Sequence, residues 1–201
     1  MQIAIVKYNA GNIYSVVHGL KRIGVEAEVT DDIERLRQAD GVLFPGQGEA
    51  ATTMSYLKAH GLDQVIKGLR QPVLGICVGM QLMCAHSEEG DVDCLGIFDV
   101  PVRRFVQTAH EQKIPHMGWD QLTDIKSPLF KGLAEGCYVY FIHSYYVERN
   151  PYSIAQNDYI QPYCAAMARD NFYATQFHPE KSGRVGEQIL SNFLDIVRQN
   201  Q

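Results

Sequence analysis

Short apolar runs ended by glycine or proline alternate with helical stretches in the first half of the chain, which strongly constrains the fold. The runs 2–8, 41–46 and 72–76 have the length and composition of buried strands, and 25–29 alternates like a strand. Segments 13–23, 49–70 and 78–86 have helical character, with an interruption at Gly61. Strands that alternate with helices predict a mostly parallel sheet covered by helices on both faces.

The second half of the chain is richer in strands than the first. Strands are predicted over 98–106, 137–147, 153–157, 163–168 and 172–177, and an amphipathic helix over 184–198 carries Val185, Ile189, Phe193 and Ile196 on one stripe. The sequence has no internal repeat, low-complexity segment or linker. We therefore expect one α/β domain over 1–201 with an antiparallel extension in its second half.

Composition excludes several classes of protein. A net charge of −5 gives no reason to expect binding to nucleic acid or to an anionic membrane, and no apolar run approaches the ~18 residues that span a bilayer. The first residues do not resemble a secretory signal. The five cysteines are odd in number and form no CxxC pair, which argues against a disulfide framework or a zinc site and favours a cytoplasmic protein. No metal or cofactor is expected.

Cys77 lies between two glycines in the run LGICVG, where a predicted strand should turn into a helix. Gly75 and Gly79 suit a tight turn of the nucleophile-elbow type. The thiol would then lie at a helix N-terminus, whose dipole stabilises a thiolate. A buried structural cysteine explains Cys77 equally well when the residue is considered alone.

A base for this thiolate is offered by the segment QFHPEKSG at 176–183. His178 follows a predicted strand, and Pro179 favours extended backbone before it. Residues i and i+2 of an extended segment point to the same side, so Glu180 can orient His178. The turn PGQG at 45–48 offers unobstructed backbone N–H groups for an oxyanion, although a plain strand-to-helix turn would need the same glycines.

The motifs PGQG, LGICVGMQL and QFHPEKSG, in this order, resemble those of the class I triad-type glutamine amidotransferases. More narrowly, YNAGNIYSV at 8–16, PHMGWD at 115–120, YFIHSYY at 140–146 and HPEKSG resemble the glutaminase subunits of imidazole glycerol phosphate synthase. The similarity extends from about residue 2 to about residue 196.

The resemblance implies roles for individual residues of the chain. Cys77 would be the nucleophile, His178 the base and acid, and Glu180 the residue that orients His178. The backbone N–H groups of Gln47 and Val78 would bind the oxyanion. The glutamine-binding positions would be Gly46, Gly48, Gln81, Ser144 and Tyr145, and those facing a partner would be Asn12, Met117, Trp119, Asp120, Tyr140 and Lys181.

By the same resemblance, the chain hydrolyses glutamine to glutamate and ammonia and forms a heterodimer with a cyclase subunit that has a (β/α)₈ barrel. The ammonia would pass through that barrel and yield imidazole glycerol phosphate and aminoimidazole carboxamide ribotide in histidine biosynthesis. Two positions depart from the family pattern. Gln47 replaces a small apolar residue, and Asp120 replaces an asparagine, which adds a negative charge near the expected interface.

Several alternatives stay open at this point. The chain could be another triad glutaminase, a catalytically silent interaction subunit, or a related subunit that supplies ammonia to a different synthase. A redox-sensing thiol protein would need a resolving cysteine, and Cys84 lies about two helical turns from Cys77, roughly 10 Å along the axis. Trp119 could also be a core residue instead of an interface residue.

Overall fold

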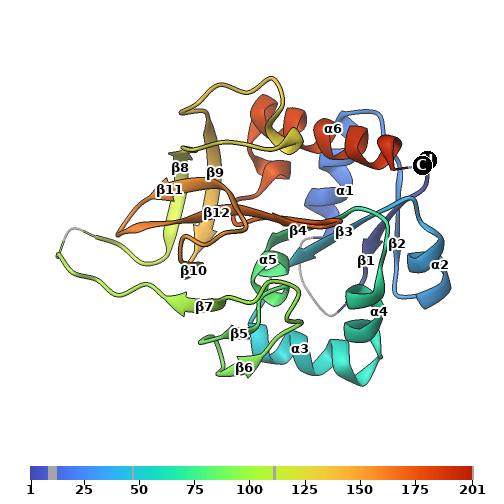
Figure 1. Cartoon of the computed structure of the whole chain (residues 1–201), viewed down its shortest axis with the longest axis horizontal. Helices are drawn as coiled ribbons and strands as arrows, with labels where there is room; N and C mark the ends of the chain where they lie inside the picture. Colours follow the sequence, from blue (N-terminus) through green and yellow to red (C-terminus); the bar gives the residue numbers. More distant parts are fainter. Residues whose placement is uncertain (9–12, 47, 111, 201) are drawn as a thin grey trace.

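The computed structural model describes residues 1–8, 13–46, 48–110 and 112–200 of the chain. Its central part is a run of parallel strands in the order β2-β1-β3-β4-β13 (Figure 1). These are β1 (Ile3–Val6), β2 (Ala27–Thr30), β3 (Gly41–Gly46), β4 (Val73–Cys77) and β13 (Phe172–Thr175). Every residue of β1, β3 and β4 is buried, which explains their continuous apolar sequences.

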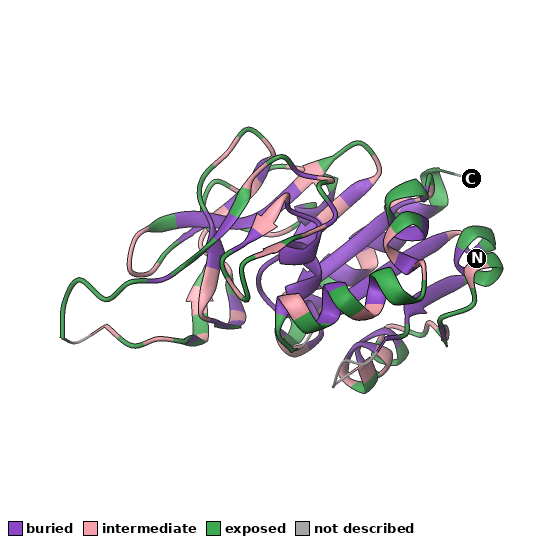
Figure 2. Cartoon of the chain, turned by 90° about the horizontal axis from the view of Figure 1, so that it is seen from below, coloured by how far each residue is buried: buried purple, intermediate pink, exposed green. Residues whose placement is uncertain are grey.

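Helices cover both faces of this parallel region, as the alternating sequence predicts. Figure 1 shows α1 and α6 on one side of the sheet and α3, α4 and α5 on the other, and Figure 2 shows that the residues between the layers are buried. The helices are α1 (Ile13–Arg22), α2 (Ile33–Gln38), α3 (Ala50–Ala59), α4 (Leu62–Gly68), α5 (Val78–Leu82) and α6 (Gly183–Gln199). Gly61 separates α3 from α4 with a left-handed φ of 66°, which confirms the predicted interruption.

Strands that pair antiparallel, apart from the parallel pair β5–β7, extend the same sheet beyond β13, so the predicted α/β architecture with an antiparallel extension is confirmed. The order continues β12-β10-β7-β5-β6, and β11 pairs with β12. These strands are β5 (His86–Ser87), β6 (Val92–Asp93), β7 (Pro101–Arg104), β10 (Tyr145–Val147), β11 (Ser153–Asp158) and β12 (Pro162–Arg169), and two short 3-10 helices are η1 (Pro128–Phe130) and η2 (Pro179–Lys181).

A separate two-stranded antiparallel sheet is formed by β8 (His116–Gln121) and β9 (Tyr138–His143). The predicted strand 137–147 is therefore two strands, because the chain leaves β9 at Ser144 and enters the large sheet as β10. The strand β8 was not predicted. Its residues alternate between an exposed and a more buried side, and this pattern is too short to stand out without its partner.

Two helical predictions differ from the structure. The helix after Cys77 was expected to reach residue 86 but ends at Leu82. In α6 the buried stripe includes Leu190, Leu194 and Val197, whereas Val185 and Ile196 are only partly buried. Among the described residues, no helix has the length and apolar character that a membrane span requires.

Candidate active site

Cys77 is the last residue of β4 and lies directly before α5, as the elbow interpretation predicts. Its backbone has φ 55° and ψ −110°, a conformation that non-glycine residues rarely adopt. Gly75 and Gly79 are absent from the residues with positive φ, so Cys77 itself carries the strain of the turn. Gly79 supplies space instead, because a Cβ there would lie 1.9 Å from the Phe44 carbonyl oxygen.

His178 and Glu180 lie together at the end of β13 and are almost completely buried. The distance between His178 Nδ1 and Glu180 Oε1 is 2.8 Å, which leaves Nε2 of the imidazole for Cys77. Burial acts to lower the pKa of His178, but the charge of Cys77, its hydrogen bond and Glu180 raise that pKa to about 10. The site therefore favours the imidazolium form of His178.

Glu180 lies against α1. A Cβ on Gly19 would lie 2.9 Å from Glu180 Cβ, and the Arg22 guanidinium donates to the Glu180 carbonyl oxygen at 2.8 Å. Within the described part of the chain, Glu180 Oε2 is buried without a hydrogen-bond partner. The contact with His178 is thus the polar interaction that fixes this side chain.

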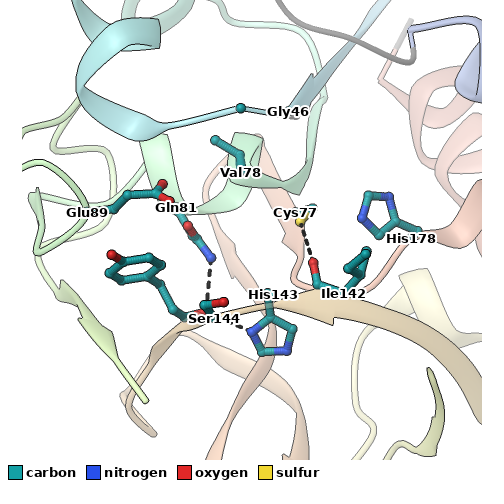
Figure 3. A pocket seen from close by; sticks show the side chains of 11 residues that line it. Gly46, Cys77, Val78, Gln81, Glu89, Ile142, His143, Ser144 and His178 are labelled. Atoms are coloured by element: carbon teal, nitrogen blue, oxygen red, sulfur yellow. Dashed lines mark hydrogen bonds between the residues drawn. The ribbon is translucent and has the colours of Figure 1, made fainter. Parts of the chain in front are cut away.

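A cavity of about 320 Å³ opens beside Cys77 and His178 (Figure 3). It brings together all the predicted glutamine-binding positions, which are far apart in the sequence. The described residues that line it are Gly46, Gly48, Cys77, Val78, Gln81, Glu89, Ile142, His143, Ser144, Tyr145 and His178. Gln47 lies outside the described residues. Among those described, no group of three or more His, Cys, Asp or Glu side chains is arranged to hold a metal ion.

Three cavity residues were not predicted from the sequence. Ile142 and His143 belong to β9, and Glu89 belongs to the turn between β5 and β6. Glu89 Oε2 accepts a hydrogen bond from the Ala50 N–H at 3.0 Å, which points the carboxylate toward the N-terminus of α3. Single residues in turns and two-residue strands carry no sequence pattern, so only the folded chain places Glu89 near Cys77.

His143 fixes the wall of the cavity through buried hydrogen bonds. Its Nδ1 donates to the Tyr145 carbonyl oxygen at 2.7 Å, and its Nε2 lies 3.2 Å from the Tyr163 hydroxyl. The same hydroxyl lies 3.1 Å from His116 Nδ1. Burial lowers the pKa of His143 to about 3, so this imidazole is neutral and Nε2 accepts the Tyr163 proton.

Most of the described residues that were predicted to face a partner lie on the small sheet. Met117, Trp119 and Tyr140 lie on the outer face of the β8–β9 sheet, and the Trp119 and Tyr140 rings are 6.1 Å apart, edge to face. Trp119 is 54% exposed, so its interpretation as a core residue is wrong. Lys181 lies in η2 and is partly exposed. Asn12 lies outside the described residues.

Asp120 requires a correction. Its side chain lies on the opposite side of β8 from Trp119, because successive strand residues face opposite ways. Its Oδ2 is 3.3 Å from Nε2 of the buried His116. The added negative charge therefore faces a histidine of this chain and not the outer face of the small sheet.

Comparisons with known proteins identify the family. Residues 4–197 match the family model described as glutamine amidotransferase class-I. Imidazole glycerol phosphate synthase subunit HisH of Bacteroides thetaiotaomicron is 62% identical over 98% of this chain and its own full length, and that of Photorhabdus laumondii is 40% identical over the same shares.

Solved structures of low sequence identity share the fold. A putative GMP synthase subunit from Thermoplasma acidophilum is 22% identical, with a TM-score of 0.77 over 100% of this chain and 96% of its own. PurLQS from Thermotoga maritima is 16% identical, with a TM-score of 0.70 over 96% of this chain and 97% of its own. The chain therefore belongs to the class-I glutamine amidotransferases and, within them, to the family of imidazole glycerol phosphate synthase HisH subunits.

Proposed function

We propose that the chain hydrolyses glutamine to glutamate and ammonia with Cys77, His178 and Glu180, and passes the ammonia to a cyclase subunit. The observation that carries this proposal is the strained Cys77 beside the His178–Glu180 pair at the mouth of the cavity. A nucleophile, a base and an orienting carboxylate in this order form the arrangement that acyl transfer requires.

The chemistry follows from the state of each group. The Cys77 thiolate attacks the side-chain amide carbon of glutamine, and a tetrahedral oxyanion forms. The His178 imidazolium gives its proton to the nitrogen, the C–N bond breaks, and ammonia leaves a glutamyl thioester. Water then attacks the thioester, His178 takes a proton from the water, and Cys77 departs as a thiolate. Glu180 stabilises the imidazolium in the states in which His178 carries the proton.

The oxyanion is assigned to backbone donors near the elbow. Val78 is the first residue of α5, and the first N–H groups of a helix have no intrahelical acceptor. The end of β3 lies directly against it, since a Cβ on Gly46 would be 2.6 Å from Val78 Cβ. The donor expected at Gln47 would come from this second segment.

Glu89 is assigned to the α-ammonium group of glutamine. It is the only carboxylate among the described residues that line the cavity, and burial raises its pKa. A bound ammonium group would offset that burial cost. Glu89→Gln should therefore raise KM for glutamine by about 10-fold or more, the loss of one charge-assisted contact, with a smaller change in kcat. An unchanged KM would remove Glu89 from the binding site.

The partner is assigned to the outer face of the β8–β9 sheet. We call this the docking face and define it by Met117, Trp119, Tyr138, Tyr140 and Ile142. Four of these are among the exposed large hydrophobic side chains of the described chain, and adjacent aromatic residues of this kind are enriched in interfaces. Lys181 is assigned to the rim.

The backbone of β9 connects the docking face to the catalytic groups. The Ile142 carbonyl oxygen lies 3.8 Å from Cys77 Sγ, and the His178 N–H donates to the Tyr140 carbonyl oxygen at 2.9 Å. The Tyr140 N–H donates to Ser182 Oγ, which donates to the His178 carbonyl oxygen. A partner that moves β9 would therefore act on both catalytic side chains, which supports activation by docking.

The name of the relatives supports the identity of the reaction that would use the ammonia. We assign the partner to a cyclase with a (β/α)₈ barrel that uses ammonia to form imidazole glycerol phosphate and aminoimidazole carboxamide ribotide. The complex would be a heterodimer that works in the cytoplasm in histidine biosynthesis.

The test measures glutamate release by the isolated chain, by the chain with the cyclase subunit, and by the complex with the cyclase's ligand. We expect very low activity in isolation and a strong increase in the loaded complex. High activity of the isolated chain would contradict the coupling. An inactive complex would favour a silent interaction subunit, and activation only by another synthase would favour a related ammonia supplier.

A further inference from the structure

Gln176 is a buried amide next to the nucleophile that the proposed mechanism does not use. It follows β13, two residues before His178, and its side chain is 0% exposed. Its Nε2 lies 3.8 Å from Cys77 Sγ, and its Oε1 accepts a hydrogen bond from Gln81 Nε2 at 3.0 Å. Gln176 therefore contacts both the reacting sulfur and a residue that lines the cavity.

A backbone carbonyl fixes the orientation of both amides. Gln81 Nε2 lies 3.1 Å from the Tyr145 carbonyl oxygen, which can only accept a hydrogen bond. The NH₂ group of Gln81 must therefore face Tyr145, and its second N–H reaches Gln176 Oε1. The oxygen of Gln176 is then occupied, and its NH₂ group is left facing Cys77 Sγ.

We propose that Gln176 is a further catalytic residue, whose side-chain N–H stabilises the Cys77 thiolate and couples it to the cavity through Gln81. A hydrogen bond from an amide to an anion is stronger than one to a neutral acceptor, so this contact favours the thiolate over the thiol. The assignment to catalysis rests on the proposed glutaminase function.

The other groups that face the sulfur also affect the balance between the thiol and the thiolate of Cys77. The Ile142 carbonyl oxygen accepts the thiol S–H and favours the neutral thiol, whereas a His178 imidazolium favours the thiolate. Gln176 is a neutral donor, so it supports the thiolate at every pH at which His178 titrates.

The same contact serves both halves of the reaction. When the thioester forms, the sulfur loses its charge and the Gln176 N–H loses its anionic acceptor. When water breaks the C–S bond, the electron pair returns to sulfur and the contact strengthens again. Gln176 thus stabilises the departing thiolate without transferring any atom of its own.

The test titrates Cys77 in the full chain without glutamine. Carbamidomethylation by iodoacetamide is followed at Cys77 by peptide mass spectrometry across pH, because the reagent reacts with the thiolate. Gln176→Met keeps the size of the side chain but removes the donor. We expect its titration midpoint to rise by about one pH unit, with about 10-fold slower modification below that midpoint.

Two further variants make the result specific. Gln176→Glu keeps the shape and the acceptor for Gln81 but removes the donor, and we expect a larger rise of the midpoint. Asn192→Leu is the matched control, because Asn192 is also a buried amide, donating to the Leu129 and Lys131 carbonyl oxygens away from Cys77. It should lower thermal stability and leave the Cys77 titration unchanged.

If the Cys77 titration midpoint of folded Gln176→Met equals that of the wild type, the inference is overturned. An equal shift of this midpoint in Asn192→Leu would overturn it as well. If Gln176→Met does not fold, the midpoint of Gln176→Glu decides the question in the same way. Thiol titration needs no glutamine turnover. A shifted midpoint, together with no glutamate release by the complex with the cyclase subunit and its ligand, would therefore contradict the proposed function while leaving the role of Gln176 intact.

Discussion

The strands β4 and β9 both reach the candidate active site, but they are built differently. β4 is buried over all of its five residues and lies between β3 and β13 in the large sheet. β9 lies in a two-stranded sheet. Phe141 and His143 are buried on one side of it, and Tyr140 and Ile142 form part of the docking face on the other. The first strand gives Cys77 a fixed position, whereas the second carries the exposed face to which we assign the partner.

Under the proposed function, this difference would let one small domain hold a reactive thiol and still respond to a partner. A strand with neighbours on both sides and helices on both faces has little freedom to move. Each strand of a two-stranded sheet has one pairing partner, and the sheet has one uncovered face, so less free energy is needed to shift such a strand. The following predictions test this division, from the largest expected effect to the smallest.

Removing the nucleophile from the fixed strand should have the largest effect. Cys77→Ala should lower glutamine-dependent synthesis by at least about 10⁴-fold, since no other described thiol lies at the elbow. Synthesis by the complex from added ammonium salts should persist, and this serves as the control for an intact partner. Wild-type glutamate release by Cys77→Ala would show that the elbow is not the catalytic position.

Changes to His178 and Glu180 should separate proton transfer from orientation. His178→Ala removes the group that moves protons, whereas Glu180→Gln keeps a side chain of similar shape 2.8 Å from the imidazole. We expect kcat/KM to fall by about 10⁴-fold in His178→Ala. In Glu180→Gln the loss of kcat/KM should be smaller than this by a factor of about 10 to 100. Equal or reversed losses would mean that the two roles are assigned wrongly.

Substitutions on the two faces of the small sheet should affect different properties, folding stability on the buried face and partner binding on the docking face. Phe141→Ala removes a fully buried ring and should lower the free energy of unfolding by about 3–5 kcal/mol. Trp119→Ala should lower it by less than about 1 kcal/mol but weaken cyclase docking by about 2 kcal/mol or more, because central aromatic residues dominate interfaces.

Thermal melting of each isolated variant and titration with the cyclase subunit measure the two effects separately. A strongly destabilised Trp119→Ala with normal docking would reverse the assignment of the two faces.

The smallest effect concerns pH and the buried side of β9. Burial lowers the pKa of His143 to about 3, below the ~6.5 of an unfolded histidine. The unfolded chain therefore binds a proton between these values that the folded chain does not, and stability falls as the pH falls. His143 should contribute a loss of about 2 kcal/mol between pH 7 and pH 5, measured by urea unfolding.

His143→Gln should reduce this pH dependence and leave the part due to His116, whose pKa burial lowers to about 4, whereas His110→Gln, at an exposed position, should leave it unchanged. An identical pH dependence in all three proteins would show that His143 is not the group that titrates on unfolding.

The sequence predicted the parallel core and the contact between His178 and Glu180 because both depend on local patterns. Continuous apolar runs ended by Gly46 and Cys77 became β3 and β4, and the i, i+2 spacing of His178 and Glu180 gave the observed contact. The strand β8, the short α5 and the cavity residue Glu89 could not be predicted, because their positions depend on partners distant in the chain.

By itself, then, the sequence determined which segments are strands and helices in the core, and that His178 and Glu180 share one side of an extended segment. Only the tertiary structure decided that Trp119 is exposed while Asp120 turns inward to His116, and that Gln176 contacts Cys77. Local periodicity fixes which residues share a face, but the burial of that face depends on what packs against it.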